Sequence, residues 1–125
     1  MLDLKTINDQ LLTTNILIVR NKIRFAESPN NPELISLWLA QESYIQELID
    51  CINIRWQYCE EQFYLLLEVV VDEMLPKHWR QHCLNNIYQP LASLKKLSTS
   101  QKSEKRLRQL LTELSTSCRY VTATL

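Results

Sequence analysis

Apolar residues recur every three or four positions along most of this chain, which is the spacing of an amphipathic helix. The first such run occupies residues 3–26, and a second begins after the turn signal at residues 28–32. Two shorter runs follow Pro76 and the polar segment 98–103. We therefore expect an all-α fold, an antiparallel helical bundle of four to five helices, organised as a single helical domain over residues 1–125.

The second run predicts one long central helix. No proline or glycine stands between Pro32 and Pro76, so nothing in the local chemistry stops a helix over residues 32–75. Such a helix would be about 66 Å long, whereas a compact chain of this size has a radius of gyration of about 14 Å. The helix must therefore bend near residues 51–53, where helix propensity is weakest, or protrude and be covered by a partner.

The later part of this helix is apolar around most of its circumference, since residues 63–76 read FYLLLEVVVDEMLP. Apolar residues at steps of three and four form a seam from Trp56 to Met74, and Leu65 and Val69 fall on the opposite side. The pattern indicates neighbours on at least two sides, and a short chain has few helices to supply them. We expect a homodimer through this seam, with these partner-binding residues: Trp56, Phe63, Tyr64, Leu67 and Val71.

The composition narrows the classes of function. Of the 125 residues, 46% are apolar and 22% are charged, which is typical of a globular chain, and glycine is absent. Phosphate loops and dinucleotide fingerprints need glycine, and no nucleophile elbow is present. We therefore expect no enzymatic activity and no cofactor. The sequence favours a small non-enzymatic interaction protein, acting as an adaptor, assembly factor or regulator through a helical apolar surface.

Charge is segregated along the chain, although the formal net charge is zero. Residues 33–73 hold nine acidic residues against one base, and residues 95–108 hold six bases against one acid. One interpretation is that the basic helix lies along the acidic one, within the monomer or across a dimer. The alternative is a nucleic-acid-associated accessory protein, whose basic C-terminal helix binds phosphates through Lys102, Lys105, Arg106 and Arg108.

Histidines and cysteines suggest a weaker hypothesis. His78 and His82 are four residues apart, a spacing that places two imidazoles on one helix face and can form half of a metal site. Against this, no third ligand is apparent, and ordinary surface histidines are the competing interpretation. The four cysteines show no CxxC spacing, and the first ten residues do not resemble a signal peptide. We expect reduced thiols, a cytoplasmic location and no membrane partner.

Overall fold

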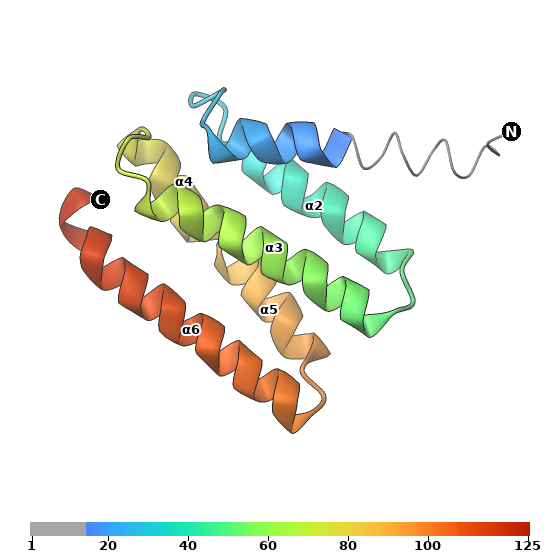
Figure 1. The fold of residues 1–125 in the computed structure, drawn as a ribbon. Helices are drawn as coiled ribbons and strands as arrows, with labels where there is room; N and C mark the ends of the chain where they lie inside the picture. The colour runs from blue at the N-terminus through green and yellow to red at the C-terminus, as the bar shows by residue number, and fades with distance from the viewer. Residues whose placement is uncertain (1–14) are drawn as a thin grey trace, which may run out of the picture.

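The computed structural model describes residues 15–125, apart from the Ala123 side chain, and places no strand among them. A helix at 15–24 is followed by α2 (Glu33–Glu47), α3 (Ile52–Val71), α4 (Lys77–Asn86), α5 (Tyr88–Leu97), α6 (Gln101–Val121) and the short 3-10 helix η1 (Thr122–Thr124). Figure 1 shows α3 in the middle, with α6 on one side and α2 on the other. The predicted all-α bundle is confirmed.

A continuous central helix over 32–75 is wrong, because α2 and α3 are separate helices that fold back on each other, and the break between them lies next to the bend expected near residues 51–53. Helix α2 ends at Glu47, and Cys51 has an extended backbone. Asp50, Cys51 and Asn53 are poor helix formers, and the Arg55 side chain donates a hydrogen bond to the Ile49 carbonyl at the corner. The corner allows the apolar faces of the two helices to pack within one molecule.

The 15–24 helix ends without glycine. Ala26 adopts a φ of 51°, in the left-handed region that glycine usually occupies at this position. The Glu27 N–H donates to the Lys22 carbonyl across the turn, which closes the end of the helix. Upstream, the Leu4, Ile7, Leu11 and Leu12 positions of the predicted helix 3–26 lie outside the described residues.

Ile87 separates α4 from α5, three residues before Pro90. Helix α4 ends at Asn86 and α5 begins at Tyr88, so Pro90 lies in the first turn of α5. The first turn has no intrahelical acceptor for its N–H groups, so a proline there costs no hydrogen bond. At the next junction, Ser100 caps α6 and exchanges hydrogen bonds with Ser103 in a capping box.

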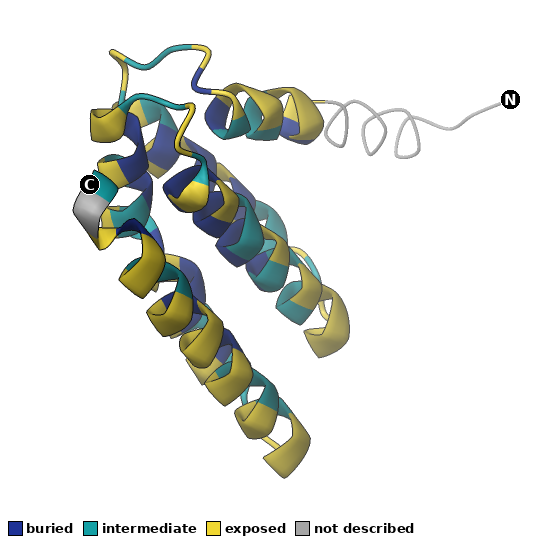
Figure 2. Cartoon of the chain, turned by 60° about the vertical axis from the view of Figure 1, so that its left-hand side comes forward, coloured by how far each residue is buried: buried dark blue, intermediate teal, exposed yellow. Residues whose placement is uncertain are grey.

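The hydrophobic core lies on α3. Phe63, Leu66 and Val70 are fully buried, and Val69, which the sequence pattern assigned to the opposite side, is fully buried as well. Helices α4, α5, α6 and α2 all contact α3, and Figure 2 shows the buried residues turned toward the interior of the bundle. The circumferential apolar character of α3 is therefore explained by contacts inside one chain.

Candidate functional site

The predicted partner-binding residues do not form one exposed patch. Phe63 is fully buried and Leu67 is 8% exposed, so both belong to the core. Val71 is exposed, while Trp56 and Tyr64 are half-buried. Of the five residues, Val71 alone is exposed, so they do not form a continuous apolar surface on α3, and their binding of a partner stays a prediction.

The acidic side of α3 is neutralised within the monomer, mostly by the 15–24 helix. Arg24 forms ion pairs with Glu68 at 3.3 Å and with Asp72 at 2.8 Å. From the other side of α3, Arg106 of α6 pairs with Glu60 at 2.7 Å. The interpretation that the basic helix lies along the acidic one holds at this contact. The larger contribution of the N-terminal helix was not predicted.

A buried polar cluster joins the 15–24 helix to α2 and α3, and its centre is Glu42. Arg20 donates to both carboxylate oxygens of Glu42, at 2.9 and 2.7 Å. Trp38 and Gln62 donate to the same carboxylate, and Arg20 also donates to Glu61 at 2.9 Å. Burial lowers the pKa of Arg20, but the hydrogen bonds and charge of Glu42 and Glu61 outweigh it and raise the pKa above its usual value.

This cluster fixes the 15–24 helix in one position, because a buried carboxylate tolerates little displacement of its partners. The sequence reasoning missed it. The signal that could have revealed it is the position of Glu42 on the same face of α2 as Ile35, Trp38 and Leu39, all of which are buried.

A second buried cation, Arg80 of α4, lies near the C-terminal end of α3 and is 2% exposed. Its Nε donates to the Val70 carbonyl at 3.0 Å. Its terminal nitrogens donate to the carbonyl and the hydroxyl of Thr124, at 3.3 and 3.1 Å. Arg80 forms no ion pair with a carboxylate among the described side chains. It therefore attaches the C-terminal turn to the end of α3.

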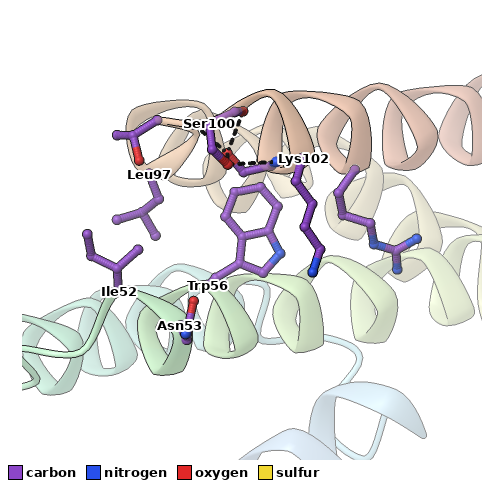
Figure 3. Close-up of a pocket in the computed structure, with 9 residues that line it drawn as sticks. Ile52, Asn53, Trp56, Leu97, Ser100 and Lys102 are labelled. Atoms are coloured by element: carbon purple, nitrogen blue, oxygen red, sulfur yellow. Dashed lines mark hydrogen bonds between the residues drawn. The ribbon is translucent and has the colours of Figure 1, made fainter.

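One pocket brings together residues that the sequence analysis assigned to different functions. Its volume is about 280 Å³, and it lies between the first turns of α3, the end of α5 and the start of α6. Trp56, Ile52 and Leu97 form its apolar side, and Lys102 and Arg106 contribute its charges. Figure 3 shows the Lys102 side chain extending from α6 toward α3 beside the Trp56 ring. We call this site the Trp56 pocket.

The two cations of the Trp56 pocket differ in their partners. Arg106 is held by Glu60, which also accepts a hydrogen bond from Trp56 Nε1 at 3.0 Å. Partial burial raises the pKa of Glu60, but the hydrogen bonds from Arg106 and Trp56 outweigh it and hold the pKa below its usual value. Lys102 is exposed and forms no ion pair within residues 15–125. Lys102 is therefore the cation that a ligand could reach.

The other two predicted phosphate-binding residues, Lys105 and Arg108, do not line this pocket. Both are exposed on α6 and border a second, shallow hollow, whose other lining residues are Arg106, Gln109, Thr112 and Glu113. Figure 2 shows the outer side of α6 as mostly exposed. Three of the four bases proposed from the sequence therefore border this hollow, Lys102 lies in the Trp56 pocket, and Arg106, which lines both, is already engaged by a carboxylate.

The histidines and cysteines occupy ordinary structural positions. His78 Nε2 lies 2.9 Å from the Pro29 carbonyl oxygen, and no group of three or more His, Cys, Asp or Glu side chains within residues 15–125 could hold a metal ion. All four cysteines are free. Burial raises the pKa of Cys83 to about 12. Burial also raises the pKa of Cys59 to about 11, although its hydrogen bond with Gln46 acts in the opposite direction. Both thiols therefore stay protonated near neutral pH.

The outward side of α2 carries an apolar stripe that the sequence analysis overlooked. Leu37, Tyr44 and Leu48 are 65%, 65% and 69% exposed, and the exposed Gln41 stands between them. Their steps of four, three and four place them on one line along the helix, opposite the buried Ile35, Trp38 and Leu39. We call these four residues the α2 stripe. The spacing of these residues was visible in the sequence, but α3 has more apolar residues, and the binding surface was predicted on α3 for that reason.

In comparisons with known proteins, no protein-family model, no curated protein and no solved structure matches this chain. Within the described residues, no helix is long and apolar enough to cross a membrane.

Proposed function

We propose that this chain is a small non-enzymatic interaction protein, an adaptor, assembly factor or regulator, that binds a protein partner through the α2 stripe. The observation that carries the proposal is the two-thirds exposure of Leu37, Tyr44 and Leu48 on one line. Large apolar side chains scattered singly over a surface need no explanation, but several on one line of an amphipathic helix are typical of a helix-docking surface. The simplest partner is a second copy of the chain.

The order of residues in the α2 stripe supports self-association. When two copies of α2 pack antiparallel about a two-fold axis, each residue meets the one at the mirrored position of the other copy. An axis between residues 42 and 43 brings Leu37 against Leu48 of the second copy and Gln41 against its Tyr44. The two leucine contacts are apolar, and a tyrosine hydroxyl can bond with an amide. The stripe is therefore complementary to itself.

The size of the stripe predicts a weak dimer. From Leu37 to Leu48 it is about 17 Å long, at 1.5 Å per residue. A stripe of this length and one side chain wide buries less area than the roughly 800 Å² per partner of a standard stable interface. We expect a dissociation constant in the micromolar range or weaker for two copies, and tighter binding for a partner that also covers neighbouring surface.

Sedimentation velocity over micromolar to millimolar protein concentrations tests the proposal. The Tyr44→Lys substitution places a charge at the centre of the stripe and should leave the protein monomeric throughout this range. Tyr120→Lys is the matched control, because it makes the same change at another exposed tyrosine, 81% exposed on α6, and should associate as the wild type does. A wild type that stays monomeric at all concentrations contradicts the proposed dimer. Equal association of both variants contradicts the assignment of the α2 stripe as the dimer interface.

A second candidate function is binding of nucleic acid by the outer side of α6. The observation in its favour is that Lys105 and Arg108 are exposed, while Glu60, Glu68 and Asp72 of the acidic helix α3 are paired with arginines. The acidic helix thus repels a polyanion less than its composition suggests.

With two phosphate contacts, the logarithm of the binding constant should fall with the logarithm of salt concentration with a slope of about −2. Fluorescence anisotropy with a labelled oligonucleotide measures this slope. The double substitution of Lys105 and Arg108 by Gln should reduce binding and flatten the slope, whereas the same substitution at Lys77, an exposed base on α4, should change neither. A binding constant that does not change with salt concentration would exclude nucleic-acid binding by this surface.

A further inference from the structure

We propose that the Trp56 pocket is a binding site for a small apolar anion, that is, a single carboxylate or phosphate carried on an aromatic or aliphatic body. The site is separate from the α2 stripe and does not depend on the interaction that we propose there. It is assembled from three helices: Ile52 and Trp56 come from α3, Leu97 from the end of α5, and the two cations from α6.

The shape of the pocket favours a ligand with a ring. Engineered apolar cavities of about 150 Å³ hold benzene, and the Trp56 pocket measures about 280 Å³. It therefore has room for a ring and for one charged group. Ile52 and Leu97 line the pocket beside the half-buried Trp56 indole, so a ring inserted there would contact an aromatic surface and aliphatic side chains.

The charges of the pocket favour an anion. Among residues 15–125, its lining contains Lys102 and Arg106 and no acidic residue. Glu60 neutralises Arg106, which leaves the ammonium group of Lys102 as the uncompensated charge at the rim. The backbone at the start of α6 is not the main attraction, because the Ser103 N–H is already bonded to the Ser100 hydroxyl and the Glu104 N–H to the Ser100 carbonyl.

Hydroxyl groups around the rim add further hydrogen-bonding capacity. Thr99, Ser100 and Ser103 line the pocket, and the two serines are engaged in the capping box. Thr99 is exposed, so its hydroxyl is accessible and can donate to an oxygen of a ligand at the rim. A ring seated against Trp56 and an anionic group at Lys102 would satisfy both sides of the pocket.

Tryptophan fluorescence gives a direct reading of this site. Trp38 and Trp79 are 1% and 0% exposed and lie in the core, so a bound ligand can contact only Trp56. Titration with benzoate and phenyl phosphate should change the emission with dissociation constants on the order of a millimolar. Benzamide, which lacks the charge, and inorganic phosphate, which lacks the ring, should both bind at least about fivefold more weakly. The Trp56→Phe variant should lose the signal.

Substitution of the lysine tests the assigned role. Lys102→Met keeps the length of the side chain and removes its charge, and it should weaken binding of benzoate by about five- to tenfold. Lys105→Met is the matched control, because Lys105 is an exposed base of the same helix outside the pocket, and it should bind as the wild type does. Equal affinity of both variants, or equal binding of benzamide and benzoate, would overturn the proposal.

The same chemistry is available from a free small molecule or from the C-terminus of a peptide. A short peptide ending in phenylalanine with a free carboxylate distinguishes the two sources when compared with its amidated form. Tighter binding of the free-acid peptide than of benzoate identifies a chain terminus, and weaker binding identifies a small molecule. If neither benzoate nor the free-acid peptide binds while sedimentation shows association through Tyr44, the pocket proposal fails and the proposed function stands.

Discussion

The buried carboxylate of Glu42 gives the most demanding prediction about stability. The Glu42 side chain is 1% exposed and that of its partner Arg20 is 14% exposed. Glu42→Gln removes the charge while keeping the size of the side chain, so among the described residues Arg20 retains only Glu61 as a carboxylate partner. Breaking a buried ion pair costs about 3–5 kcal/mol. Because Glu61 remains, we expect a loss of about 2–3 kcal/mol, which lowers Tm by roughly 10 °C in a domain of this size.

Urea denaturation followed by circular dichroism measures this loss in the free energy of unfolding. Glu61→Gln is the matched control, since it removes the other carboxylate of Arg20. Glu61 is 46% exposed and its pair should contribute no more than about 1 kcal/mol. A double-mutant cycle with Arg20→Met should give a coupling energy above about 1 kcal/mol for Glu42. Equal costs for the two Gln substitutions would refute the account of the buried cluster.

Three further predictions concern pH, backbone strain and the C-terminal turn. The folded-state pKa of Glu60 is lowered, so its ion pair with Arg106 stabilises the fold at pH values above the ordinary carboxyl pKa of 4.5. This stabilisation is lost as pH falls below that value. Glu60→Gln should therefore flatten the dependence of the free energy of unfolding on pH in this range. Ala26→Gly should raise the free energy of unfolding by about 1 kcal/mol in urea denaturation, because Ala26 is held at positive φ, and a loss of stability would contradict this reasoning. Arg80→Met should cost about 2 kcal/mol and speed amide hydrogen exchange in the last turn of the chain, because it leaves buried carbonyl groups without a donor; unchanged exchange there would show that Arg80 does not hold this turn.

The helical class of the fold was readable from the sequence, but the corner between α2 and α3 was not. The spacing of apolar residues identifies helices because helical periodicity is a local property. The corner at residues 48–51 contains neither proline nor glycine, and the gain from packing α2 against α3 is a tertiary effect. Weak propensity near Cys51 marked the place without showing that the chain reverses there.

The candidate sites were less predictable because they depend on which faces the neighbouring helices cover. Phe63 and Leu67 have the character of binding residues in the sequence, yet they are core residues once α4, α5 and α6 are in place. Leu37 and Tyr44 look ordinary in the sequence and stand exposed because no described helix covers that side of α2. Likewise, Trp56 and Lys102 are 46 positions apart in the sequence and meet only in the folded chain.

The arrangement of the two α2 helices can be tested by a rescue experiment. In the proposed dimer, residue 44 of one copy faces residue 41 of the other, so a lysine at one position and a glutamate at the other would form ion pairs across the interface.

Sedimentation velocity on the Gln41→Glu/Tyr44→Lys double variant is the most direct measurement. We predict that Tyr44→Lys alone is monomeric, that the double variant regains the dimer, and that added salt weakens this regained dimer. A double variant that stays monomeric while the wild type associates would contradict the antiparallel pairing of the α2 stripe, and a wild type that never associates would contradict self-association altogether.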